Sequence, residues 1–527
     1  MAKGPRKQPK SRDEVAPPAK KWNVFVYLAG DNNLSDEMVW SLLGMQTAAE
    51  DPRFAKRVNL TAVFDPLRLA PLVYRFPAKE PRHSDRFELE DFGGKRSPLA
   101  RLSGQTTLSQ LSHFVDEQRI DPELPAGATV QRMMILSGHG DGVSGLLNGN
   151  PSGGVLTVRQ LGELLRNDVA ARQSIEPGRD ARLEILGLEA CAMGMLELCH
   201  ELRKSVKWLV GTESFVQNHG WPYERMLAPL FSRDDPKEVA TEMVQCYHRY
   251  YTEFDIGGVS TDIAAVDLQS LESSGLVKAI ADLAATLCVL LNEVEGEPAE
   301  SAAEKRARVG QKSSAPKGPE EVLLDALVVA RWKAQSYSQD DFVDLEDWIV
   351  QLQHALRGGP TLGGVQEKCR AVLTALARAA PLSRYQGPAY QHSHGLSVYY
   401  PAAESRYRGS HANYKDLSFA QDTGWPEFLK LYLGKTRRGL RKEGEREKGV
   451  DGAELPYSYD EDGEPAQATV VPGSVRTPSN GTKRQTPSNG IRTPEELEGY
   501  VKNGPRAWYR DRRFQTDDAD RAARRKG

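Results

Sequence analysis

The sequence is poor in cysteine, and no two cysteines form a CxxC pair. Its 527 residues contain only five, at Cys191, Cys199, Cys246, Cys288 and Cys369. An odd and scattered set argues against a disulfide framework and against a thiolate zinc site. No run of about 18 apolar residues is present, so we expect no transmembrane helix. The N-terminus lacks the apolar segment of a secretory signal, and we therefore expect a cytoplasmic protein.

An excess of one charge is also lacking. The 69 Lys and Arg residues nearly balance the 72 Asp and Glu residues, and the net charge is −3. No global field then attracts nucleic acid or an anionic membrane, so we expect neither as a partner. The chain is long enough for a large core, and 39% of its residues are hydrophobic, which is typical of a globular protein. Any preference for a charged ligand must therefore come from a local pocket.

Short apolar runs alternate with helical patterns along the first half of the chain. The runs predict strands at 23–29, 58–64, 132–136, 182–186 and 206–210, and helices are expected at 34–50, 107–118, 157–168 and 192–204. This alternation is typical of parallel βαβ units. We therefore predict an α/β fold, a three-layer α/β/α sandwich with a mostly parallel central sheet.

Polar residues directly follow several of these predicted strands. They are Asp31, Asp65, His139, Cys191 and Glu213. In such sheets ligands bind at the carboxyl ends of the strands. We therefore expect these side chains to converge on one edge of the sheet and to form a functional site there.

Cys191 and His139 are the residues of this set that suit covalent chemistry. A cysteine attacks as its thiolate, which needs an electropositive setting or an adjacent base. A helix beginning near Ala192 would place its unpaired N–H groups and positive dipole end beside Cys191. Gly138 and Gly140 flank His139, and their backbone can approach a substrate closely and offer an N–H group to an oxyanion.

Each of these signals has an ordinary structural alternative. A cysteine after a strand is more often a small buried apolar residue. A histidine between glycines can be a turn residue or a metal ligand. The glycine-rich stretch 137–142 resembles a phosphate loop, but no Gly-Lys-Ser/Thr follows it. Only the combination of a histidine and a cysteine at two strand ends favours a cysteine nucleophile.

Six segments, in collinear order from about 22 to 433, resemble the clostripain family of cysteine peptidases. They are Val26-Tyr-Leu-Ala-Gly-Asp-Asn-Asn-Leu34, Ser137-Gly-His-Gly-Asp-Gly142, Glu189-Ala-Cys-Ala-Met-Gly-Met-Leu-Glu197, His219-Gly-Trp-Pro-Tyr223, Val343-Asp-Leu345 and Gly395-Leu-Ser-Val-Tyr-Tyr-Pro401. The resemblance implies a caspase-like fold and a cysteine endopeptidase that cleaves proteins after a basic P1 residue. It implies Cys191 as nucleophile, His139 as general base, and the N–H groups of Gly140 and Cys191 as oxyanion donors.

The substrate-binding residues are less clearly marked than the dyad. Relatives carry an Asp that lines the S1 pocket two residues before the cysteine, and this chain has Glu189 there. A carboxylate is kept, so an ion pair with Arg or Lys is expected. Asp31 and Glu213, at other strand ends, are predicted to contact substrate as well. Three alternatives are a legumain-type preference for Asn at P1, where Glu also occurs, a non-catalytic scaffold that binds partners through its tails, and an acyltransferase or ligase that uses the same dyad.

Composition divides the chain into a tail, a domain and a second tail. The expected parts are a basic flexible tail at 1–21, a clostripain-like peptidase domain at 22–434 with its catalytic core at about 22–235 and its C-terminal part at about 236–434, a polar flexible insertion at 293–320, and a charged, repeat-containing tail at 435–527. A final strand is predicted at 395–401. A regulatory protein is a further expected partner of the tails.

We expect the peptidase to stay latent until it is activated, since an uncontrolled cytoplasmic protease would be toxic. Some relatives mature by cutting themselves between the histidine and the cysteine. No Lys or Arg occurs from Gly140 to Val158, which leaves Arg172, Arg179 and Arg182 as candidate sites. No cofactor is expected. Calcium dependence is known in the family, but no compact acidic loop in the sequence indicates it.

Overall fold

The computed structural model describes 22–67, 71–76, 90–91, 111, 115, 130–148, 154–253, 259–292, 318–338, 341–357, 362 and 364–447. The basic tail at 1–21 and the repeats of the second tail lie outside the described residues. Most of the helix expected at 107–118 and of the insertion expected at 293–320 lies outside them too. Helix α11 begins at Pro319, inside the range expected for that insertion.

A nine-stranded mixed sheet forms the centre of the molecule. From one edge to the other its strands are β11 (Leu382–Gln386), β8 (Thr261–Asp267), β7 (Val206–Gly211), β6 (Leu183–Glu189), β5 (Gln131–Ser137), β1 (Trp22–Gly30), β2 (Val58–Pro66), β3 (Leu72–Phe76) and β4 (Glu90–Asp91). The five strands from β7 to β2 are parallel. The strands outside them pair antiparallel. The predicted α/β sandwich with a mostly parallel sheet is confirmed.

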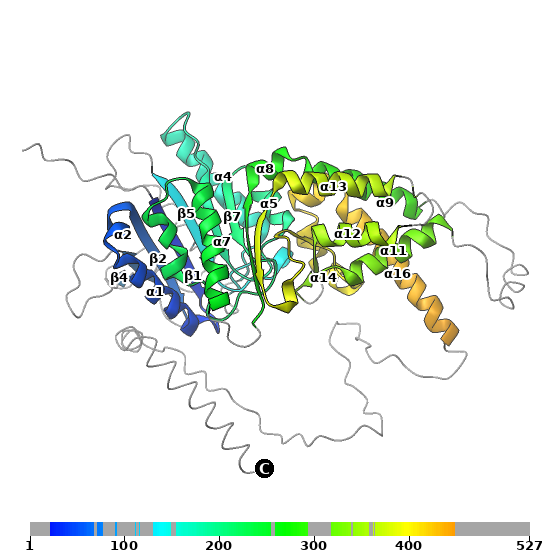
Figure 1. Ribbon diagram of the computed structural model, residues 1–527, viewed down its shortest axis with the longest axis horizontal. Helices are drawn as coiled ribbons and strands as arrows, with labels where there is room; N and C mark the ends of the chain where they lie inside the picture. Colours follow the sequence, from blue (N-terminus) through cyan, green and yellow to red (C-terminus); the bar gives the residue numbers. More distant parts are fainter. Residues whose placement is uncertain are drawn as a thin grey trace, which may run out of the picture.

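Both faces of the sheet are covered, which explains why its strands read as continuous apolar runs. All seven residues of β6 are buried. The helices on one face are α1 (Ser35–Ala49), α2 (Pro52–Arg57), α6 (Tyr223–Met226) and α7 (Pro236–Glu253), and those on the other are α4 (Val158–Ile175), α5 (Leu196–Leu202) and α8 (Leu268–Ser273). Figure 1 shows α7 lying across one face. The connections between parallel strands bring their carboxyl ends to one edge.

The C-terminal part packs beside this sheet as a group of helices with a small sheet of its own. The helices are α9 (Leu276–Asn292), α11 (Pro319–Lys333), α12 (Leu345–Ala355), α13 (Val365–Ala379), α14 (Glu404–Tyr414), α15 (Ser418–Thr423) and α16 (Trp425–Glu447) (Figure 1). Helix α16 continues past 434, where we expected the domain to end. No helix in the described ranges is long and apolar enough to span a membrane.

The strand predicted at 395–401 forms, but not in the main sheet. It is β12 (Ser397–Tyr399), which pairs with β10 (Phe342–Asp344), and β10 pairs with β9 (Ser336–Tyr337). The N–H of Ser397 donates to the carbonyl oxygen of Gly194 at 2.9 Å. This small sheet therefore holds the loop that follows β6, and the C-terminal part supports the edge where we expect the site.

Candidate active site

The register of β5 and β6 places His139 next to Cys191. Ser137 lies opposite Glu189 in the parallel ladder, and the N–H of Gly138 donates to the carbonyl oxygen of Glu189 at 3.1 Å. His139 and Cys191 each follow two residues later. The backbones then touch, because a Cβ added at Gly140 would collide with the carbonyl oxygen of Cys191 and lie 2.9 Å from its nitrogen. Only glycine fits at position 140.

The imidazole of His139 is held by Asn33 from the neighbouring strand end. Asn33 lies in the loop between β1 and α1, and its Oδ1 is 2.8 Å from Nε2 of His139. An amide oxygen only accepts hydrogen bonds, so Nε2 carries the proton and Nδ1 is left as the basic nitrogen. Burial lowers the pKa of His139 below its ordinary 6.5. The imidazole is therefore neutral at physiological pH and able to accept a proton.

The thiol of Cys191 is in a less electropositive setting than the sequence suggested. Helix α5 begins at Leu196, not near Ala192, so its dipole end does not meet the sulfur. The loop between β6 and α5 runs along the segment after β7 instead. There the N–H of Ala192 donates to the carbonyl oxygen of Ser214, and the N–H of Gly194 donates to that of Thr212. Burial raises the pKa of the Cys191 thiol, and the N–H of Val216, 3.3 Å from Sγ, partly offsets this. The expected helix-dipole activation is wrong for this structure.

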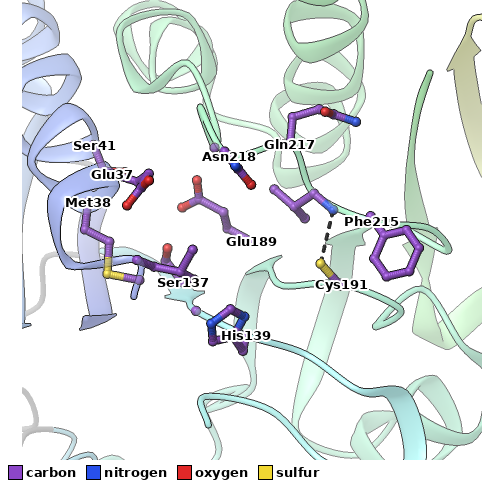
Figure 2. A pocket seen from close by; sticks show the side chains of 14 residues that line it. Glu37, Met38, Ser41, Ser137, His139, Glu189, Cys191, Phe215, Gln217 and Asn218 are labelled. Atoms are coloured by element: carbon purple, nitrogen blue, oxygen red, sulfur yellow. Dashed lines mark hydrogen bonds between the residues drawn. The ribbon is translucent and has the colours of Figure 1, made fainter. Parts of the chain in front are cut away.

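A pocket of about 340 Å³ opens between α1 and the ends of β5, β6 and β7. It is lined by Leu34, Glu37, Met38, Ser41, Ser137, Gly138, His139, Glu189, Cys191, Phe215, Val216, Gln217, Asn218 and Gly220. Figure 2 shows the side chains of His139, Cys191 and Glu189 around this space. Phe215 stands beside Cys191 with 48% of its surface exposed (Figure 2). The structure thus brings three of the predicted site residues into one cavity.

Glu189 is a buried carboxyl group, held rigidly at this pocket. One of its oxygens accepts the N–H of Trp221, and the other accepts the hydroxyl of Tyr223 at 2.7 Å. Only 4% of the residue is exposed. Burial raises its pKa to about 7, against the hydrogen bonds from Tyr223, Trp221 and Ser137, which lower it. A cation entering the pocket would meet an acid that is close to half ionised at neutral pH.

Comparison with known proteins places this geometry in context. A model of the clostripain family matches residues 128–432, which is more than half of the chain.

The chain belongs to the clostripain family.

As members of this family are cysteine peptidases, the protein is a cysteine peptidase and hence a hydrolase. The roles of the individual residues stay predictions. No curated protein sequence matches the chain.

Solved structures with a similar fold include C11 proteases of two bacteria. A secreted C11 cysteine protease from Bacteroides thetaiotaomicron, iotapain, is 14% identical with a TM-score of 0.51, and the match covers 77% of this chain and 99% of that one. A secreted C11 cysteine protease from the same bacterium in complex with an irreversible peptide inhibitor is 15% identical with a TM-score of 0.49, and the match covers 77% of this chain and 99% of that one. An inactive zymogen C11 protease from Parabacteroides distasonis is 17% identical with a TM-score of 0.47, and the match covers 78% of this chain and 99% of that one. Because the identity is only 14%, the likeness to iotapain supports the fold of this chain and nothing more.

Two predicted substrate-binding residues of this clostripain-family chain do not line the pocket. Glu213 is fully buried, and it accepts the N–H of Gly395 at 2.7 Å. Because Gly395 precedes β12 in the C-terminal part, the side chain of Glu213 points into the junction with that part. Asp31 lies at the expected sheet edge but is not among the lining residues. Both predictions inferred contact with substrate from position at a strand end, which does not fix where a side chain points.

Three residues that hold side chains of the site were not predicted in that role from the sequence. Asn33 holds the imidazole of His139, while the neighbouring Asn32 accepts the N–H of Leu34 with its Oδ1. Trp221 and Tyr223 hold the carboxyl of Glu189. The position of Asn33 after a strand was an available signal for its place at the site. Trp221 and Tyr223 lie in one of the segments that carry the resemblance, but nothing in the sequence indicates their contact with Glu189, which arises only through the fold.

No group of three or more His, Cys, Asp or Glu side chains is placed to hold a metal ion within the part of the chain that the structure describes. The expectation of no cofactor and the calcium dependence known in the family both stay untested.

Proposed function

We propose that this clostripain-family peptidase cleaves proteins after Arg or Lys, with Cys191 as nucleophile and His139 as general base. The observation that carries this proposal is one pocket lined by Cys191, His139 and the buried carboxyl of Glu189. A nucleophile, a neutral base and an acidic group are the parts that such a reaction needs.

The proposed mechanism starts with a proton transfer within the dyad. Nδ1 of His139 takes the thiol proton, while the bond from Nε2 to Asn33 keeps the ring oriented. Sγ of Cys191 then adds to the scissile carbonyl carbon. The protonated His139 gives its proton to the leaving amine, which breaks the C–N bond and leaves a thioester. A water molecule, deprotonated by His139, hydrolyses the thioester and restores the thiol.

The developing oxyanion needs donors at the same place. We assign this role to the main-chain N–H groups of Gly140 and Cys191, whose backbones are in contact. In the described ranges, no hydrogen bond runs from the N–H of Gly140 to a main-chain oxygen. This N–H is therefore available to a substrate carbonyl, which supports the assignment.

Glu189 is the proposed partner of a basic P1 side chain. A second candidate comes from its pKa of about 7, because a protonated carboxyl could instead donate to the side-chain oxygen of Asn at P1. That would give a legumain-type specificity. Binding of a cation stabilises the ionised form, and for this reason we favour Arg and Lys.

We further propose that the enzyme rests in a latent state. The raised pKa of Cys191 and the lowered pKa of His139 favour a neutral thiol and a neutral imidazole, not a thiolate–imidazolium pair. The N–H of Val216 donates to the sulfur and favours the thiolate, but it only partly offsets the effect of burial. Reaction of the resting enzyme with iodoacetamide is expected to be slow at neutral pH and to rise with pH. A full chain that cleaves at full rate from the first seconds, with its tails intact, would contradict latency.

Self-cleavage between histidine and cysteine would need a second molecule. Arg172 lies within α4 and pairs with Asp168, whereas Arg179 and Arg182 lie in the connection between α4 and β6, where both are partly exposed. That connection leads into the amino end of β6, and the pocket lies at its carboxyl end. An intermolecular cut at Arg179 or Arg182 predicts an initial rate of processing that rises with the square of the protein concentration.

The test of the proposed function uses purified full-length protein and its Cys191→Ala variant. Fluorogenic peptides with Arg, Lys, Asn or Asp at P1 are assayed with and without calcium. Cleavage after Arg or Lys that is lost in Cys191→Ala is the expected result. Cleavage after Asn alone would support the second candidate, and activity that survives in Cys191→Ala would refute the assignment of the nucleophile.

A further inference from the structure

The pocket carries a second carboxyl group, from Glu37 on α1. Leu34, Met38 and Ser41 line the same wall as Glu37. Their spacing of about one and two helical turns places all four on one face of the helix. Figure 2 shows Glu37 and Glu189 entering the pocket from different elements, the helix α1 and the end of β6. The cavity is therefore acidic on two walls.

Glu189 alone is a limited partner for a fully charged side chain. Each of its oxygens already accepts a hydrogen bond, from the N–H of Trp221 and from the hydroxyl of Tyr223. Because burial raises its pKa to about 7, only part of its population is ionised at neutral pH. Glu37 is less buried than Glu189 and lies in the first turn of α1, where the helix dipole favours an ionised carboxylate. Glu37 thus adds a second acidic group to the pocket, on a different wall from Glu189.

We infer that Glu37 is a specificity-determining residue, which together with Glu189 makes the pocket select Arg over Lys at P1. This inference rests on the proposed cleavage after basic residues. A guanidinium has five N–H donors along two edges, so it can bind one carboxylate on each of two walls. The lysine ammonium is a compact charge on a flexible stem and gains less from two separated acids. Leu34, Met38 and Val216 offer apolar surface to the aliphatic stem of either side chain.

The experiment compares full-length wild-type protein with Glu37→Gln on peptides that differ only in Arg or Lys at P1. Asp36→Asn is the matched control, because Asp36 lies in the same first turn but is not among the pocket residues. The loss of a hydrogen bond to a charged group predicts a fall in kcat/KM for Arg of about tenfold to a hundredfold in Glu37→Gln. The fall for Lys is expected to be several times smaller, and Asp36→Asn should keep the wild-type ratio.

A second variant, Glu37→Asp, keeps the charge and should retain more of the preference for Arg than Glu37→Gln does. Equal losses for Arg and Lys in Glu37→Gln would overturn the selection of Arg, and unchanged kinetics would overturn any role of Glu37 in specificity. The wild-type arm separates this inference from the proposed function. A wild-type enzyme that cleaves after neither Arg nor Lys refutes the proposed P1 specificity before any Glu37 variant is measured.

Discussion

Oδ1 of Asn33 lies 2.8 Å from Nε2 of His139, although 106 residues separate them in the sequence. The contact arises because β1 and β5 are neighbouring parallel strands whose ends meet at the same edge. An amide oxygen at Nε2 selects the tautomer in which Nδ1 is free to take a proton. Asn33 is thus a positioning residue that acts on the reaction through His139.

Replacing Asn33 by Ala should lower kcat while leaving KM nearly unchanged, because the substrate does not need this side chain to bind. We expect a loss of roughly tenfold to a hundredfold, within the contribution of a well-oriented general base. Asn33→Asp places a carboxylate beside the imidazole and should raise the pKa of His139, which moves the acidic limb of the pH–rate profile to higher pH. A purely structural role would change stability but leave that limb in place.

The raised pKa of Glu189 predicts how activity depends on pH. Since burial raises the pKa of Glu189 to about 7, its ionised form is lost as the pH falls through that value. For an Arg substrate, kcat/KM should fall about tenfold per pH unit below about 7, because it reports the free enzyme. The corresponding limb of kcat should lie at lower pH, since a bound cation favours the carboxylate.

Glu189→Gln is the control for this assignment. The variant should lose the limb near pH 7 and keep one at lower pH from His139, whose pKa burial lowers below 6.5. Profiles of both proteins are measured on the same Arg peptide at high substrate excess and at limiting substrate. If the limb near pH 7 persists in Glu189→Gln, another group causes it.

A substitution at Gly140 tests the proposed oxyanion site. A Cβ at this position would collide with the carbonyl oxygen of Cys191, so Gly140→Ala must push the two strand ends apart. Removal of one oxyanion donor typically lowers kcat by about 100-fold to 1,000-fold, and we expect a loss of that order. Gly409→Ala is the control, because its Cβ would meet nothing within 4 Å. A Gly140→Ala protein whose kcat stays within threefold of wild type (~0.7 kcal/mol) would exclude this N–H from the mechanism.

The sequence was sufficient to predict the five parallel strands of the central sheet. Parallel strands buried on both faces must be apolar throughout, so runs such as 132–136 and 182–186 stand out without any tertiary information. The same regularity brings His139 and Cys191 to one edge, because the ends of parallel neighbours coincide. The antiparallel strands β3, β4 and β11 were not predicted. Of these, β11 is partly exposed and lacks a comparable apolar run.

The failures concern side-chain direction and tertiary contacts. Glu213 follows a strand as Cys191 does, yet its side chain enters the core, where the N–H of Gly395 from the C-terminal part meets it. The helix expected at Ala192 starts at Leu196 because Ala192 and Gly194 bond to the segment after β7. These partners are far away in the sequence. No local pattern encodes them.

The buried position of Glu213 leads to a prediction about stability. Burial, and then the nearby Asp344 and Asp262, raise the pKa of Glu213 well above its ordinary 4.5. The unfolded chain releases this proton near pH 4.5 and the folded chain releases it only at higher pH. The folded state therefore loses stability as the pH rises from 4.5 to the folded pKa, by about 1.4 kcal/mol for each unit between the two values.

Glu213→Gln removes this ionisation but keeps an oxygen that can accept the N–H of Gly395. The free energy of unfolding of the variant should gain on that of the wild type as the pH rises above 4.5, and the difference should level off once the wild-type group ionises. Urea unfolding at a series of pH values measures it, with the exposed Glu367→Gln as a control that should follow the wild type. A variant that instead loses stability relative to the wild type with rising pH would mean that Glu213 is ionised in the fold, stabilised by a cation such as the protonated His394 beside Asp344.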